Sequence, residues 1–190
     1  QRINVPLHQA QKDETEKLLN LKNIISTKLI GQREAITAVA QAIREYRSGL
    51  ARRGGPIASF LFIGPTGVGK TELAKIIAQL QFGSENLLVR LDMSEYQEPS
   101  SIYRLIGSPD GAARGFLAEA VLEKPYSLIL LDEFEKAHPD ILNIFLQILD
   151  DGRLTDNLGR LVDFQNTIII ATSNAHSEFI KKEIESGIAV

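Results

Sequence analysis

The sequence of 190 residues contains no cysteine and no tryptophan, and it has three histidines, His8, His138 and His176. Without cysteine, the chain can form neither disulfides nor thiolate metal sites. The three histidines are too far apart in the sequence to suggest a ligand cluster. The sequence therefore predicts no structural metal site and no disulfide framework.

Long apolar runs are also missing. Runs such as Leu128–Leu131 and Ile168–Ala171 are far shorter than the roughly 20 residues of a membrane-spanning helix. No signal-peptide pattern opens the chain. A formal net charge of −3 gives no overall attraction to nucleic acid or to an anionic membrane. We therefore expect a cytoplasmic protein with neither nucleic acid nor a membrane as its partner.

The overall composition is typical of a globular protein, with 44% hydrophobic and 24% charged residues. At this length we expect one compact unit. Apolar residues recur at helical spacing between Lys12 and Ile30, and again from Ala35 to about Gly49. A turn-rich connector follows at Arg52–Pro56.

Beyond the connector, short apolar runs alternate with helical patterns. Helices are predicted at about Lys70–Phe82 and Ile141–Leu149. Four runs are typical of buried strands: Ser59–Ile63, Leu87–Leu91, Tyr126–Leu131 and Thr167–Ala171. This alternation predicts a parallel sheet in a layered α/β fold.

One segment matches the phosphate-binding pattern G-x-x-x-x-G-K-[ST], and it lies between a predicted buried strand and a predicted helix. Its glycines let backbone N–H groups converge on phosphate oxygens at the positive end of the helix. We expect Lys70 to bind the β and γ phosphates and Thr71 to ligate Mg²⁺. The pattern therefore predicts a site for ATP or ADP with Mg²⁺. The matching residues are Gly64, Pro65, Thr66, Gly67, Val68, Gly69, Lys70 and Thr71.

Asp132 and Glu133 follow the apolar run Leu128–Leu131, at the C-terminal end of a predicted buried strand. Open α/β sheets bind their ligands at this edge. The pair is typical of a Walker B motif, in which Asp132 would hold Mg²⁺ and Glu133 would polarise the water that attacks the γ-phosphate. The alternative is that the two carboxylates only cap the strand or the next helix.

Thr172, Ser173 and Asn174 follow the last predicted strand, which would bring a polar side chain to the same sheet edge. This placement alone indicates little, because an asparagine after a strand most often forms a turn. The residues by themselves leave the role of Asn174 open.

Four blocks of the sequence resemble the second nucleotide-binding module of the Clp/Hsp100 family of AAA+ proteins. The blocks are LIGQREAITAVAQAIRE, GPTGVGKTELAK, LILLDEFEKAHPDILNIFLQILDDGRLTD and GRLVDFQNTIIIATSN. The resemblance implies a three-layer P-loop NTPase fold with a five-stranded parallel sheet. Residues 1–55 would form a linker and helical lead-in, and residues 56–190 the large subdomain of the ATPase core without its small lid subdomain.

The resemblance also implies roles for single residues. Asn174 is similar to the sensor-1 residue, which contacts the γ-phosphate and helps to place the attacking water, so it joins Glu133 and Lys70 as a candidate catalytic residue. Ile30 lies in a segment similar to the stretch that contacts adenine. The implied activity is ATP hydrolysis by a protein unfoldase, a disaggregase or the ATPase partner of a compartmental protease. Protein substrates and a hexameric ring are the implied partners, in the cytoplasm or in an organelle of bacterial origin.

One segment departs from the family pattern. The family has a longer loop with an aromatic residue that contacts the translocating polypeptide in the central pore, whereas residues 111–115 are Gly-Ala-Ala-Arg-Gly. Alanine and arginine offer less apolar contact area than an aromatic ring. Phe116 could substitute, but its position before Leu117 favours a core residue at the start of a helix. The resemblance places a second pore-facing loop at about Asn157–Gly159.

The family's arginine finger and sensor-2 arginine would lie beyond the last residue. Because such a finger is worth ~10³ to 10⁵ in rate, we expect the chain alone to hydrolyse ATP slowly. Two other functions stay open. A P-loop kinase or helicase is disfavoured by Glu133 and Asn174, and a non-enzymatic, nucleotide-gated scaffold is kept open by the altered loop.

Overall fold

The computed structural model describes residues 21–28, 33–49, 54–64 and 69–175. The chain divides into two compact units, Gln1–Ala51 and Arg52–Val190. The linker expected at the start of the chain lies outside the described residues. No helix in the described ranges is long and apolar enough to cross a membrane.

The described residues of the first unit form two helices, α2 (Leu21–Lys28) and α3 (Arg33–Arg47), which pack on each other. On α3 the buried residues Ile36, Val39, Ala40 and Ile43 recur at helical spacing and form one apolar face. The acidic Glu34 lies in the first turn of this helix, where it complements the helix dipole. Both helices were predicted from this periodicity, and the structure confirms them within the described residues.

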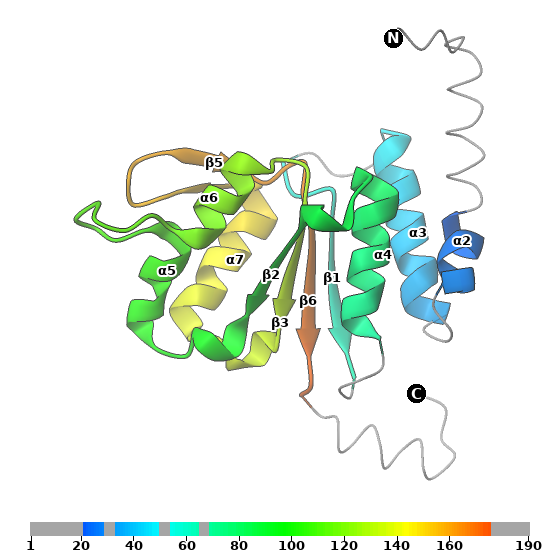
Figure 1. The fold of residues 1–190 in the computed structure, drawn as a ribbon, viewed down its shortest axis with the longest axis horizontal. Helices are drawn as coiled ribbons and strands as arrows, with labels where there is room; N and C mark the ends of the chain where they lie inside the picture. Colours follow the sequence, from blue (N-terminus) through cyan, green and yellow to red (C-terminus); the bar gives the residue numbers. More distant parts are fainter. Residues whose placement is uncertain (1–20, 29–32, 50–53, 65–68, 176–190) are drawn as a thin grey trace, which may run out of the picture. The chain divides into compact units, whose positions relative to one another are not determined.

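The second unit is built on a parallel sheet, drawn at the centre of Figure 1. In the described residues the sheet has four strands in the order β1-β6-β3-β2. The fifth strand that the family resemblance implies is not among them. The strands are β1 (Ala58–Ile63), β2 (Leu88–Asp92), β3 (Leu128–Asp132) and β6 (Ile168–Ser173). All four strands predicted from the sequence are therefore present, with ends shifted by one or two residues.

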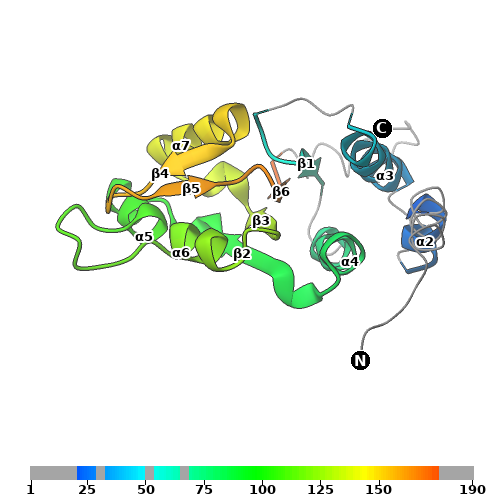
Figure 2. The ribbon, with the colours of Figure 1, turned by 90° about the horizontal axis from the view of Figure 1, so that it is seen from above.

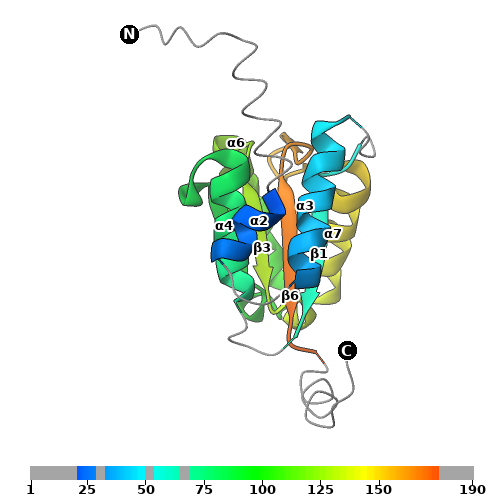
Figure 3. The same cartoon turned by 90° about the vertical axis from the view of Figure 1, so that its right-hand side faces the viewer.

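Helices cover both faces of this sheet, as expected for a layered α/β fold (Figure 2). Helix α4 (Lys70–Phe82) lies on one face, and α5 (Ile102–Ile106), α6 (Phe116–Glu123) and α7 (Pro139–Asp151) lie on the other. Figure 3 shows strands β3 and β6 between α4 and α7. Every residue of β3 and of β6 is buried, which explains why both read as continuous apolar runs.

Individual residues set the two ends of helix α7. His138 caps its first turn by accepting a hydrogen bond from the N–H of Asp140 at 3.2 Å. The helix ends at Gly152, whose φ of 63° suits glycine. A Cβ at this position would also lie 2.5 Å from the carbonyl oxygen of Gly54. The site therefore requires glycine for two independent reasons.

A small antiparallel hairpin follows α7 and was not predicted. Its strands are β4 (Arg153–Thr155) and β5 (Leu161–Asp163), and a turn of residues 156–160 joins them. Strands of three residues are too short to show a clear alternation of apolar and polar side chains. The remaining short elements in the described part of the chain are four 3₁₀ helices: η1 (Glu85–Leu87), η2 (Met93–Glu95), η3 (Pro99–Ser101) and η4 (Phe134–Lys136).

Candidate active site

The carboxyl ends of the parallel strands meet at one edge of the sheet. The strand register places Asp92 beside Asp132, and Ile63 beside Ser173. An open cavity of about 420 Å³ lies at this edge, which is within the usual size range of small-molecule sites. Its lining residues are Gly69, Lys70, Thr71, Glu72, Arg90, Asp92, Asp132, Glu133, Thr172 and Asn174.

Lys70 is the first residue of α4 and reaches across the ends of two strands. Its Nζ donates to the carbonyl oxygens of Gly64 at 2.6 Å and Ser173 at 3.2 Å. A third hydrogen bond runs to Asn174 Oδ1 at 2.8 Å. Burial lowers the pKa of the Lys70 ammonium, although nearby carboxylates act in the opposite direction. The ammonium is thus held at the sheet edge with its three donors directed at neutral oxygens.

The two ends of the phosphate-binding segment are described. Gly64 follows β1, and its N–H donates to the Ser173 carbonyl at 3.1 Å. Gly69 precedes α4 with a φ of 90°, a backbone conformation that favours glycine. Pro65, Thr66, Gly67 and Val68 lie outside the described residues, as does Ile30 in the predicted adenine-contacting stretch.

Both carboxylate oxygens of Asp132 accept a hydrogen bond from a residue of a neighbouring strand. Oδ2 lies 2.6 Å from Arg90 Nε on β2. Oδ1 accepts from the Thr172 hydroxyl on β6 at 3.0 Å. Sequence reasoning assigned no role to Arg90 or to the Thr172 side chain. The sequence did offer an indication of a role for Arg90, because this charged residue interrupts the apolar run Leu87–Leu91.

Glu133 has an unusual backbone. Its φ of 54° and ψ of 47° place it in the left-handed region, the one non-glycine residue there in the described part of the chain. Its N–H lies 3.4 Å from Thr172 Oγ1. The left-handed conformation turns the chain from β3 into η4 and costs about 1 kcal/mol or more. Glu133 lines the cavity at the sheet edge.

The Asn174 side chain links the cation and the carboxylate of the site. Its Oδ1 accepts from Lys70, and its Nδ2 donates to Glu133 Oε1 at 3.3 Å. Its backbone N–H donates to Glu135 Oε1 at 3.2 Å. Burial acts to raise the pKa of Glu135, but hydrogen bonds that include those from Ser173 and Asn174 outweigh it and hold the pKa below its usual value. Glu135 therefore fixes the backbone at Asn174 as an ionised carboxylate.

The donor set suits a nucleotide with a bound magnesium ion. Thr71 and Asp132 line the cavity and supply one hydroxyl and one carboxylate. No group of three or more His, Cys, Asp and Glu residues is arranged to hold a metal alone within the described ranges. Magnesium usually takes one or two protein ligands and fills its other positions with phosphate oxygens and water. The residues present fit that arrangement.

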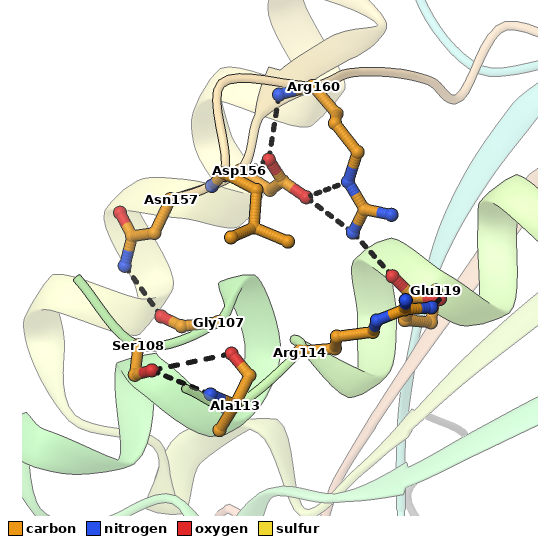
Figure 4. A network of polar contacts seen from close by, with 9 residues as sticks. Gly107, Ser108, Ala113, Arg114, Glu119, Asp156, Asn157 and Arg160 are labelled. Carbon is orange, nitrogen blue, oxygen red and sulfur yellow. Dashed lines mark hydrogen bonds and ion pairs between the residues drawn. The ribbon is translucent and has the colours of Figure 1, made fainter. Parts of the chain in front are cut away.

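The segment of residues 107–115, which contains the altered residues 111–115, packs against the turn between β4 and β5 (Figure 4). Ser108 closes the segment on itself, because its N–H donates to the Ala113 carbonyl at 2.9 Å and its hydroxyl accepts from the Ala113 N–H at 2.8 Å. Asn157 joins the segment to the turn by donating from Nδ2 to the Gly107 carbonyl at 2.6 Å. We call these two segments, residues 107–115 and 156–160, the paired loops.

An arginine and two carboxylates tie the paired loops to α6. Arg160 donates to the Asp156 carboxylate at 2.8 Å and also to Glu119. Glu119 accepts a further hydrogen bond from Arg114 at 3.3 Å. The hydrogen bond from Arg160 holds the pKa of Glu119 below its usual value.

The expectation that Phe116 is a core residue was wrong. Phe116 begins α6 as predicted, but 52% of its surface is exposed. The buried face of α6 consists of Leu117, Ala118 and Val121, and Phe116 points away from it towards a second cavity that Arg114 also lines. The sequence pattern located the helix correctly but not the direction of its first side chain.

Comparison with known proteins gives consistent matches. Residues 55–188 match the family model described as AAA domain (Cdc48 subfamily). Over 98% of its length the chain is 52% identical to chaperone protein ClpB of Oceanobacillus iheyensis and covers 24% of that protein. It is 53% identical to the negative regulator of genetic competence ClpC/MecB of Bacillus subtilis, with the same coverage of both chains. The chain thus spans about a quarter of the length of these relatives.

Solved structures of Hsp104 share the fold. The closed state of Hsp104 with ATPγS and FITC casein has a TM-score of 0.85 at 44% identity, covering 94% of this chain and 31% of that chain. The ADP complex of Hsp104 from S. cerevisiae has a TM-score of 0.83 at 44% identity, covering 95% of this chain and 32% of that chain.

Proposed function

The chain belongs to the AAA domain family (Cdc48 subfamily), and we propose that it is the ATP-binding and ATP-hydrolysing core of a Clp/Hsp100-type protein unfoldase, disaggregase or protease-associated chaperone. The observation that carries this proposal is the linkage of Lys70, Asn174 and Glu133 beside Asp132 at one sheet edge. The group supplies a cation for phosphates, a carboxylate for a metal ion and a second carboxylate for water. These are the parts that nucleotide hydrolysis requires.

Nucleotide binding would use the start of α4 and the segment before it. We assign the triphosphate to the N–H groups of residues 64–71 and to the Lys70 ammonium, which exchanges its neutral oxygen partners for charged ones. Thr71 and Asp132 would hold Mg²⁺, which shields phosphate charge when bound. Ile30 would contact the adenine ring.

Hydrolysis would use Glu133 and Asn174. In this proposal the Glu133 carboxylate accepts the proton of a water molecule as the water oxygen bonds to the γ-phosphorus. The bond between the γ-phosphorus and the bridging oxygen of ADP breaks, and ADP and phosphate are released. The Asn174 amide orients the Glu133 carboxylate and contacts the γ-phosphate. Glu133, whose backbone is left-handed, lines the cavity beside Asp132 and Asn174.

The partners follow from the family. One Hsp104 structure that resembles this chain contains FITC casein, a protein, together with ATPγS. By analogy, we propose that the longer protein containing this module acts on protein substrates as a hexameric ring in the cytoplasm, or in an organelle of bacterial origin. A compartmental protease would be a further partner of such a ring.

A second candidate function is a nucleotide-gated scaffold, or a motor that does not thread its substrate in the usual way. The specific observation in its favour is the loop of residues 107–115, which has no aromatic side chain and is closed by its own hydrogen bonds. A loop of this kind offers little apolar surface for holding a varied polypeptide.

Phosphate release and reporter unfolding, measured together on the longer protein assembled as a ring, test the two candidates. An unfoldase releases phosphate and unfolds a tagged reporter, and Glu133→Gln abolishes both. A scaffold binds nucleotide but leaves the reporter folded. Wild-type protein that binds no nucleotide would contradict both candidates, and phosphorylation of an acceptor would indicate a kinase.

A further inference from the structure

Arg90 contacts the proposed metal-binding carboxylate, and the hydrolysis proposed above gives it no role. Its Nε lies 2.6 Å from Asp132 Oδ2. The Asp132 side chain is 11% exposed, whereas the Arg90 side chain is 57% exposed. Arg90 also lines the cavity that contains Lys70 and Thr71. An exposed cation therefore contacts the nearly buried carboxylate that is the proposed metal ligand.

The two partners of Asp132 differ in their effect on a metal ion. The Thr172 hydroxyl is neutral and contacts Oδ1, so it can orient the carboxylate while a divalent cation is bound. The Arg90 guanidinium is positively charged at all physiological pH values. At such short range it repels a divalent cation, and it also occupies one of the two carboxylate oxygens of Asp132. Arg90 and a metal ion therefore exclude each other at Asp132.

We propose that Arg90 is a built-in competitor of the divalent cation at Asp132. The inference rests on the proposed function, because it takes Asp132 as a metal ligand. With Arg90 in place, the carboxylate is neutralised and attracts little free Mg²⁺. Nucleotide phosphates supply the negative charge that favours the ion over the guanidinium. Arg90 thereby makes metal binding depend on bound nucleotide.

The surroundings of Arg90 allow it to leave Asp132 without disturbing the core. Arg90 also lines a second cavity of about 490 Å³, which includes Asp92 and Glu95. The Glu95 carboxylate, which already pairs with Arg104 at 2.8 Å, is 57% exposed and can accept a second guanidinium. The second cavity therefore offers the displaced side chain two carboxylates, beside the guanidinium groups of Arg104 and Arg114.

Calorimetric titration of the full chain with the non-hydrolysable analogue AMP-PNP, in EDTA and at increasing Mg²⁺, tests the proposal. The affinity measured with Mg²⁺ divided by the affinity measured in EDTA gives the factor by which Mg²⁺ strengthens binding. We expect Arg90→Gln to raise this ratio by about fivefold, the worth of a partly exposed ion pair. Arg90→Lys keeps the positive charge and should stay closer to wild type. Arg153→Gln is the matched control, because Arg153 is an exposed arginine that lines neither of the two cavities.

Three results would overturn the inference. An unchanged ratio in Arg90→Gln shows that Arg90 does not compete with the ion. Weaker AMP-PNP binding by Arg90→Gln at saturating Mg²⁺ shows that Arg90 contacts phosphate instead. Failure of the wild-type chain to bind AMP-PNP under either condition contradicts the proposed function as well, whereas the first two results leave nucleotide binding intact.

Discussion

The Thr172 hydroxyl holds the acidic pair at the end of β3. It donates to Asp132 at 3.0 Å, lies 3.4 Å from the Glu133 N–H, and belongs to a residue that is 3% exposed. A buried hydrogen bond to a charged group stabilises a fold more than an exposed one does, because its loss leaves the charge without a partner. Thr172 thus contributes to both stability and site geometry.

Thr172→Val should lower the free energy of unfolding by about 1–3 kcal/mol, because valine has the shape of threonine but leaves Asp132 without one of its two donors. Thr172→Ser keeps the hydroxyl and should lose less. Urea unfolding of the three proteins measures the difference. Equal stability of the valine variant and the wild type would show that the hydroxyl does not support Asp132.

Glu133 combines backbone strain with a proposed catalytic carboxylate. Replacement by glycine relieves the left-handed conformation, whereas replacement by alanine keeps it. We expect Glu133→Gly to be more stable than Glu133→Ala by about 1 kcal/mol, while both lose ATP hydrolysis. Chemical unfolding gives the stability comparison. An alanine variant as stable as the glycine variant would contradict the strain.

The site residues differ in how far the sequence revealed them. Lys70 was predicted from the phosphate-binding pattern, Glu133 from the end of a predicted strand and Asn174 from the family resemblance. In the structure, hydrogen bonds link the three side chains. Arg90 and Thr172 were not assigned, because their contacts with Asp132 depend on strand register between segments about 40 residues apart. A single sequence contains no direct signal for such register.

The paired loops, residues 107–115 and 156–160, form one connected unit between neighbouring helices and strands. The Arg160 guanidinium joins the turn after β4 to α6, and Asn157 donates from its backbone to the Ile106 carbonyl at 3.0 Å. Loops connected in this way are expected to open together and not independently.

Arg160→Gln should therefore increase amide hydrogen exchange in both loops and not only in residues 156–160. The glutamine cannot bridge Asp156 and Glu119 as a cation. Arg153→Gln, a change at an exposed arginine on the neighbouring strand β4, is the control and should leave exchange unchanged. Faster exchange confined to residues 156–160 would contradict a connected unit.

The contact between Arg160 and Glu119 predicts that the stability of the fold depends on pH. The pKa of Glu119 is lowered in the folded chain by its hydrogen bond from Arg160, so its stabilising contribution is complete above the unfolded-state value of about 4.3. The contribution is lost as the pH falls through the lower pKa of the folded state. The stability difference between wild type and Arg160→Gln should shrink below about pH 4 in unfolding titrations. A stability difference between the two proteins that stays constant down to pH 3 would contradict this prediction.

Short apolar runs and strong helical spacing made the main elements predictable. The whole of α4 and the four sheet strands follow from these patterns. The hairpin of β4 and β5 did not, because its three-residue strands are fixed by contacts with α6 and α7 and not by local periodicity. The exposed position of Phe116 likewise depends on the path of the altered loop before it.

For the chain as a whole, nucleotide should stabilise the folded state by mass action. A ligand at 100 times its dissociation constant adds about 2.7 kcal/mol, which corresponds to a rise in melting temperature of about 5–10 °C for a unit of this size. ADP with Mg²⁺ should produce this shift in the wild type and not in Lys70→Ala. A shift of equal size in Lys70→Ala would place the nucleotide elsewhere.

The central claim is that this sheet edge both binds and hydrolyses ATP. The most direct test measures ATP binding and phosphate release side by side for the wild type, Lys70→Ala and Glu133→Gln. The account predicts that Lys70→Ala loses binding, and that Glu133→Gln binds ATP as tightly as the wild type but releases no phosphate. Phosphate release by Glu133→Gln at the wild-type rate would contradict it.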